Sequence, residues 1–177
     1  MASPRRIGLP LVAAAAVVLS AGITVSSLFA EGSLDLGVGG YGVCAPVRDG
    51  GILVGNSITN RGDEPLTLSS VRLERVRGVT LLESAILSGQ PSIGVSNYPV
   101  QKSEIAEKGW DHREPVEGYV LDTGEEVELA LAAGLTPETR KGSFTGYAIE
   151  YIDSSGVTRV AHSGDIELEL RYLGECP

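Results

Sequence analysis

Apolar and polar residues alternate along most of the chain from Gly51 onward. The alternating apolar positions are Ile52, Val54 and Ile58, then Leu66 and Leu68, then Val127, Leu129 and Leu131, then Tyr147, Ile149 and Tyr151, and finally Ile166, Leu168 and Leu170. A period of two, interrupted by turns about every ten residues, is typical of the strands of a β-sandwich. We therefore predict an all-β fold, an antiparallel β-sandwich of about seven to nine strands over residues 51–177.

Breaks in the pattern predict specific local structures. Val71 and Leu73 lie on the opposite parity from Leu66 and Leu68, which predicts a β-bulge near Ser69-Ser70. The turn-forming run at 60–65, which includes Arg-Gly-Asp, is expected to close a hairpin, as is the run at 153–156. The Asp-Thr-Gly at 122–124 is interpreted as a β-turn as well.

The stretch from Ser88 to Glu117 has little periodicity and contains three prolines. A short strand or a helical turn is expected within it, because long structureless loops are rare inside a compact domain. It contains the only tryptophan beside three ionisable residues: Trp110, Asp111, His112 and Arg113. These four are candidate ligand-binding residues, since Trp and Arg are frequent anchors of binding surfaces. The alternative is that Trp110 fills the core and its neighbours bridge nearby strands.

The N-terminal thirty residues carry the signature of a targeting segment. Arg5 and Arg6 precede a run of 24 uncharged residues from Ile7 to Ala30. A short basic start before an apolar run is typical of a signal peptide, and this run is also long enough to span a bilayer as a helix. Residues 1–30 are therefore predicted to be a signal peptide or a signal anchor, and both alternatives place residues 31–177 outside the cytoplasm. Residues 31–50 are glycine-rich and are predicted to form a lead and a first strand.

Cys44 and Cys176 are the only cysteines, and they bracket almost the whole predicted exported part. An oxidising compartment would let them pair, so we predict a structural disulfide between the first strand and the C-terminus. No zinc site is expected, because the two cysteines lack the closely spaced ligand pairs of such sites.

The charge excludes some classes of partner. The net charge is −9, and all 23 acidic residues lie beyond residue 30 together with only twelve basic ones, so the predicted exported part carries −11. Such a domain lacks the basic clusters that bind nucleic acid or anionic lipid. No cofactor or metal is expected. The acidic positions of two predicted strands, Glu126, Glu128, Glu167 and Glu169, are expected on outward faces, where calcium binding is a conceivable alternative use.

Two segments carry a resemblance to known proteins. GNSITNRGDEPLTLSSVRL resembles the strand-turn-strand of bacterial immunoglobulin-like domains, and LDTGEEVELAL resembles a turn and strand common in the same group. The layout is similar to small exported proteins of high-GC Gram-positive bacteria (actinobacterial type). The resemblance implies an immunoglobulin-like β-sandwich behind the N-terminal hydrophobic helix, without the cysteine pair around a core tryptophan that antibody domains have.

The sequence thus predicts an extracytoplasmic, non-enzymatic module that binds or scaffolds an envelope protein or polymer, with a membrane contact only through the N-terminal segment. One alternative is a small exported hydrolase with its site in the 88–117 region. Another is a calcium-dependent adhesion module.

Overall fold

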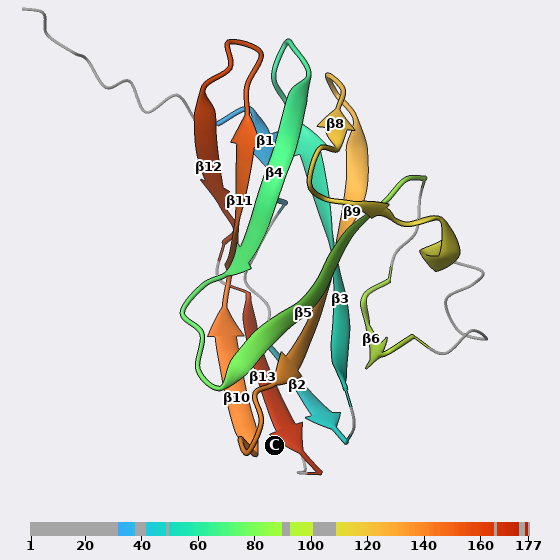
Figure 1. The fold of residues 1–177 in the computed structure, drawn as a ribbon, viewed down its shortest axis with the longest axis vertical. Coiled ribbons are helices and arrows are strands. Elements are labelled where there is room, and N and C mark those ends of the chain that lie inside the picture. Colours follow the sequence, from blue (N-terminus) through green and yellow to red (C-terminus); the bar gives the residue numbers. More distant parts are fainter. Residues whose placement is uncertain are drawn as a thin grey trace, which may run out of the picture.

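The computed structural model of the chain describes residues 32–37, 42–48, 50–89, 93–100, 109–164, 166–173 and Cys176. Within them the chain forms three sheets (Figure 1). The six-stranded sheet contains β1 (Leu34–Asp35), β3 (Gly51–Asn60), β9 (Glu126–Leu135), β5 (Val79–Leu87) and β7 (Glu114–Pro115) in that order, with β6 (Val95–Tyr98) also paired to β3. The three-stranded sheet has the order β10 (Lys141–Thr145), β13 (Glu167–Tyr172), β2 (Gly42–Val47). The four-stranded sheet has the order β12 (Thr158–His162), β11 (Tyr147–Ile152), β4 (Leu66–Leu73), β8 (Val120–Leu121).

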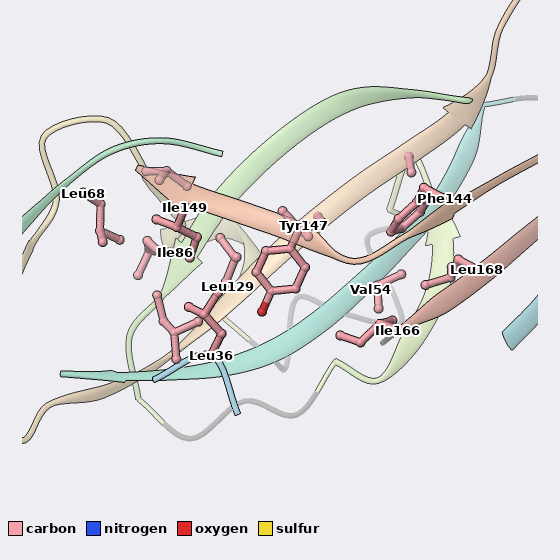
Figure 2. Packing of buried hydrophobic residues seen from close by; sticks show 14 of the residues in the cluster. Leu36, Val54, Leu68, Ile86, Leu129, Phe144, Tyr147, Ile149, Ile166 and Leu168 are labelled. Carbon is pink, nitrogen blue, oxygen red and sulfur yellow. The ribbon is translucent and has the colours of Figure 1, made fainter. Parts of the chain in front are cut away.

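The two smaller sheets together face the six-stranded sheet. Only Gly146, with φ +78°, separates β10 of the three-stranded sheet from β11 of the four-stranded sheet. A nearly continuous strand therefore links the two smaller sheets. Apolar side chains from all three sheets form one cluster, which includes Leu129 of β9, Phe144 of β10 and Tyr147 of β11 (Figure 2). The alternating positions of the sequence thus fill the space between two layers, and the prediction of an all-β sandwich-like architecture is confirmed, with every strand pairing but one antiparallel among the described residues.

Several local predictions are confirmed. In the pairing of β4 with β11, Glu150 lies opposite Ser70 and Tyr151 opposite Leu68, so Ser69 is the extra residue of a bulge. Asp153 begins the turn of the β11–β12 hairpin and accepts a hydrogen bond from the backbone N–H of Val157 at 3.0 Å.

Other predictions need correction. From Gly51 onward the described residues form eleven strands, β3–β13, more than the seven to nine expected there, because the two-residue strands β7 and β8 pair at the sheet margins. The pairing of β2 with β13 is parallel, in a sandwich expected to be antiparallel throughout. Parallel neighbours need a long connection, and here almost the whole chain separates the two strands, so no local pattern reveals their pairing.

The turn at 60–65 does not close a hairpin. It carries the chain from β3 in the six-stranded sheet to β4 in the four-stranded sheet. Asn60 is fully buried, and its side-chain amide donates to the carbonyl oxygens of Glu64 at 2.9 Å and Leu121 at 3.0 Å. Its Oδ1 accepts from the N–H of Gly62 at 2.9 Å. Asn60 therefore fixes a crossing between the two layers. Arg-Gly-Asp belongs to a turn, as predicted, but this turn connects two sheets and does not close a hairpin.

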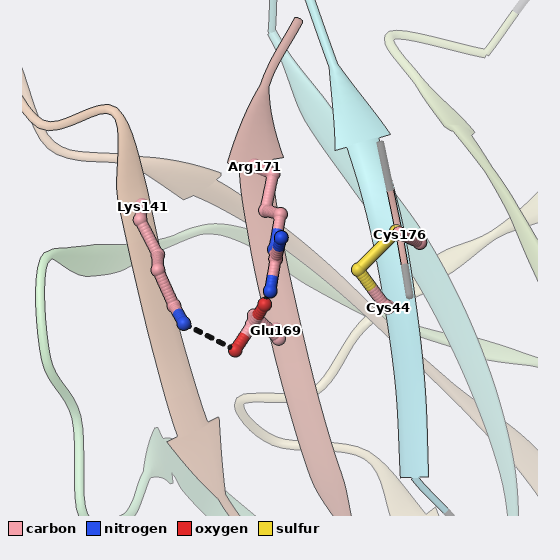
Figure 3. Close-up of a disulfide and its surroundings, with 5 residues drawn as sticks. All are labelled: Cys44, Lys141, Glu169, Arg171 and Cys176. Carbon is pink, nitrogen blue, oxygen red and sulfur yellow. Dashed lines mark hydrogen bonds and ion pairs between the residues drawn. A yellow bond between two sulfur atoms is a disulfide. The ribbon is translucent and has the colours of Figure 1, made fainter. Parts of the chain in front are cut away.

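The predicted cysteine pair forms a disulfide across a sequence separation of 132 residues, with Cα atoms 5.6 Å apart (Figure 3). Cys44 lies in β2, directly opposite Glu169 of β13. On the same sheet Glu169 accepts from Lys141 Nζ at 2.8 Å and pairs with Arg171. The disulfide thus fastens the edge strand β2 to the end of the chain, and it is compatible with an extracytoplasmic location.

The predicted targeting segment, residues 1–30, lies outside the described residues, as do four of the six positions of the glycine-rich run at 37–42. Among the residues that are described, none belongs to a helix with the length and apolar character needed to span a membrane.

Candidate functional site

The 88–117 region supplies the strands β6 and β7 of the six-stranded sheet, and other parts of it pack on the outer face of that sheet. Residues 51–54 of β3 are buried on both faces, and the run from Val127 to Gly134 in β9 is buried throughout, with Glu128 its one charged residue. A strand that is covered on both sides shows such a continuous apolar run in place of alternation. Side chains that point away from the main core form a second cluster with this region: Leu53, Leu87, Ile93, Trp110, Ala130 and Ala132, with Tyr98 and Val100 packed beside them.

Trp110 is a structural part of this second cluster. It begins a 3-10 turn, Trp110–His112, and only 8% of its surface is exposed. The guanidinium carbon of Arg113 lies 4.6 Å from the centre of the indole ring, and Arg113 Nη1 donates to the Trp110 carbonyl oxygen at 3.2 Å. A cation over an aromatic face is attracted by the ring quadrupole. Arg113 therefore covers the ring, which supports the alternative in which Trp110 fills a core.

Glu83 of β5 fastens this region to the sheet. One of its carboxylate oxygens accepts from Arg113 Nε at 2.6 Å and the other accepts from the Tyr98 hydroxyl at 2.7 Å. Desolvation raises the pKa of Glu83, but the hydrogen bonds from Tyr98 and Arg113 outweigh it and hold the pKa below the ordinary 4.5. The same bond to Glu83, followed by burial, raises the pKa of Tyr98. The cluster is thus a charge-assisted clasp between three segments.

The structure brings together only two of the four predicted site residues. Trp110 and Arg113 contact each other, while Asp111 and His112 are exposed. Within the described part of the chain, neither Asp111 nor His112 has a side-chain hydrogen bond or an ion pair. The arrangement holds a loop in place: Arg113 covers the indole ring and is itself exposed.

Glu128 departs from its predicted outward position. Only 8% of it is exposed, and its Oε1 accepts from the backbone N–H of Ile93 at 2.7 Å. The carboxylate lies directly over Gly55, whose own N–H donates to the Gly94 carbonyl oxygen at 2.9 Å. The alternating pattern placed Glu128 correctly on the face opposite the main core, but a single sequence does not reveal that another segment covers this face.

The predicted row of outward carboxylates does not form one site. Glu126 and Glu128 belong to the six-stranded sheet, whereas Glu167 and Glu169 belong to the three-stranded sheet. Among the described residues, no group of three or more His, Cys, Asp or Glu is arranged to hold a metal ion.

Ser88, Ser163 and His162 each have a different polar partner. Ser88 in the 88–117 region contacts Glu114 at 3.3 Å and the Tyr119 hydroxyl at 3.4 Å. His162 is exposed and lies 2.9 Å from Glu74, whereas the hydroxyl of its neighbour Ser163 accepts the backbone N–H of Tyr147 at 2.8 Å. These pairings show no nucleophile held by a histidine within the part of the chain that the structure describes.

One end of the outer face of the four-stranded sheet carries a row of uncharged side chains, most of them exposed. The register places Val120, Thr67, Ile152 and Thr158 in one row across β8, β4, β11 and β12. Val160 lies two residues beyond Thr158 on the same face of β12. The exposed fractions of Val120, Ile152 and Val160 are 53%, 38% and 42%. Apolar side chains that gather on one face of a sheet can form a contact surface for another protein. We refer to Val120, Thr67, Ile152, Thr158 and Val160 as the outer row.

The strand β12 also ends its sheet and borders a groove. It pairs only with β11 among the described strands. A groove of about 460 Å³ runs between this edge and β1 of the other layer. It is lined by Gly32, Leu34, Asp35, Leu36, Gly37, Arg61, Val160, Ala161 and His162. Sequence reasoning identified β12 as a returning hairpin strand but not as a sheet edge, because its position in the sheet depends on the distant strands β4 and β8.

Comparisons with known proteins give limited information. No family model and no curated protein match the chain. Among solved structures, it is similar to the VesB protease of Vibrio cholerae (TM-score 0.39, 13% identity, covering 80% of this chain and 32% of that one). It is also similar to the secreted serine protease VesC of Vibrio cholerae (0.39, 15%, covering 82% and 24%) and to the ASH / PapD-like domain of human CEP192 (0.36, 9%, covering 79% and 84%).

The chain spans about a third of VesB and a quarter of VesC.

Proposed function

We propose that this protein is an extracytoplasmic, immunoglobulin-like binding module that recognises a protein of the cell envelope without catalysing a reaction. The two-layered arrangement of sheets and the disulfide between Cys44 and Cys176 support this proposal. A disulfide that closes almost the whole described chain suits an oxidising compartment.

The observation that carries the proposal is the outer row at the margin of the four-stranded sheet. Its apolar members are exposed in a strongly acidic chain, and they lie beside a strand whose far edge is unpaired within the described residues. Exposed apolar side chains next to an open strand edge suit a protein partner, because both side-chain and main-chain contacts become available to it.

The location of the outer row on the four-stranded sheet supports the proposal as much as its exposure does. The ring of the only tryptophan, Trp110, is covered by Arg113, which Glu83 holds in place. The 88–117 region therefore supports the six-stranded sheet in this proposal, and recognition belongs to the four-stranded sheet on the other layer.

The test is capture of envelope proteins by the tagged full-length protein after crosslinking in its native cells. Val160→Asp introduces a charge into the outer row. Val76→Asp is the matched control, since Val76 is 41% exposed and lies between β4 and β5, away from the outer row. We expect a reproducible envelope protein with the wild type and with Val76→Asp, and its loss with Val160→Asp. Equal capture by all three proteins would contradict the proposal.

A further inference from the structure

The backbone of β12 offers a regular set of hydrogen-bonding groups at its far edge. The N–H of Ser163 donates to the Tyr147 carbonyl oxygen at 2.9 Å, and the N–H of Asp153 donates to the Val157 carbonyl oxygen at 3.0 Å. Because hydrogen-bonded and non-bonded pairs alternate along an antiparallel ladder, Arg159 and Ala161 bond to β11. The N–H and C=O groups of Thr158, Val160 and His162 therefore point away from β11, and no described strand pairs with them.

The groove beside this edge can hold side chains of an added strand. Leu34 and Leu36 supply the apolar part of the groove lining on the β1 side. Asp35 and Arg61, also in the lining, form an ion pair with each other. A strand added to β12 would direct every second side chain to the same side of the sheet as Arg159 and Ala161, and Ala161 lines this groove. An aliphatic side chain suits these inward positions.

The outward positions of an added strand favour positive charge. Glu150 of β11 lies directly opposite Val160, on the outer face. Its carboxylate makes no ion pair with any residue that the structure describes, and the whole chain has a net charge of −9. A Lys or Arg opposite Val160 would have a stem long enough to pass this valine and approach Glu150.

From the free edge, the groove and Glu150 together, we propose that β12 binds an extended segment of its partner as an additional antiparallel strand, with aliphatic side chains in the groove and basic side chains on the outer face. This inference rests on the proposed function and specifies the partner's chemistry. Main-chain hydrogen bonds supply affinity in this mode of recognition, and alternating side chains supply specificity.

A second copy of this chain fits the same edge less well. Two β12 strands paired antiparallel about Val160 would each place Arg159 opposite Ala161 of the other copy on the groove side. A small methyl group and a guanidinium would then face Leu34 and Leu36. The apolar lining therefore favours a partner segment with larger aliphatic residues.

The test uses the full-length protein and a short synthetic peptide of alternating Lys and Leu. In an antiparallel addition, the Lys amides face Thr158, Val160 and His162, and the Leu amides face solvent. One peptide carries N-methyl groups on the Lys amides, and the matched control carries them on the Leu amides, so that charge and composition are identical. We expect the Lys-methylated peptide to bind at least about tenfold more weakly than the control, because it lacks the donors that face β12.

Equal affinities of the two methylated peptides, or no binding of the unmodified peptide, would overturn the inference. Concentration-dependent dimers that Val160→Pro abolishes would also overturn it, since a second copy would then occupy the edge. Val160→Pro removes the N–H at this position, and Val160→Thr retains it as the control. If the envelope partner is lost with Val160→Asp but kept with Val160→Pro, the proposed function stands and strand addition fails. If neither change affects capture, the proposed function itself fails.

Discussion

The contact between Gly55 and Glu128 gives the sharpest prediction about how the outer segment is held on the sheet. A Cβ at position 55 would lie 1.7 Å from Glu128 Oε1 and 3.0 Å from the Cβ of Ile93. Gly55→Ala must therefore displace the carboxylate from the Ile93 N–H, to which it now bonds at 2.7 Å. Loss of a buried hydrogen bond to a charged group, together with the local overpacking, costs about 2–4 kcal/mol of unfolding free energy.

Urea unfolding followed by the fluorescence of Trp110 measures this cost, because the only tryptophan lies in the same outer cluster. Gly42→Ala is the control, since a Cβ there meets no atom within 4 Å. We expect Gly42→Ala to remain within about 0.5 kcal/mol of the wild type or to be slightly more stable. Adding Glu128→Ala to Gly55→Ala should restore part of the loss, because the clash is then removed. If Gly55→Ala is as stable as the wild type, the placement of Glu128 over Gly55 is refuted.

Three further changes test the described contacts. Replacing Cys44 and Cys176 together by Ser should lower the unfolding free energy in urea by up to about 5 kcal/mol, because the unfolded chain loses a cross-link over 132 residues; an unchanged midpoint would contradict this. Trp110→Ala should cost about 3 kcal/mol or more by circular dichroism melts, whereas a fully stable variant would show that the ring is not part of a core. Because the pKa of Glu83 is depressed in the folded state, its ionised carboxylate stabilises the fold at pH values above its ordinary pKa of 4.5. This contribution disappears as the pH falls through the folded-state pKa. Glu83→Gln should therefore flatten the loss of stability between about pH 5 and pH 3, and an unchanged pH profile would argue against the clasp.

The sequence pattern predicts strands well where one side faces the core and the other faces solvent. The change of parity between Leu68 and Val71 correctly located the bulge at Ser69, because a strand can present both sets of apolar residues to one core only by inserting a residue. The β11–β12 hairpin can be predicted equally well, since residues close in sequence stabilise the turn at Asp153.

Prediction fails where the structure depends on contacts between distant residues. The turn residues that begin at Asn60 predict a hairpin. The side-chain amide of Asn60, however, donates a hydrogen bond to the Leu121 carbonyl oxygen, 61 residues away, and the turn crosses between the layers. Glu128 looked solvent-exposed because the covering segment around Ile93 has no periodic pattern of its own. The sequence shows the residues around Trp110 as a cluster, but it does not show whether the ring is covered. Arg113 covers the ring, and it is held there by Glu83, a residue of a distant strand.

The most direct test of recognition through β12 is amide hydrogen exchange of the protein, free and bound to its captured envelope partner. In the free protein, the amides of Thr158, Val160 and His162 should exchange rapidly, while those of Arg159 and Ala161, bonded to β11, exchange slowly. In the complex, the account predicts that the first three become protected as well. Edge amides that exchange equally fast in both states would contradict it.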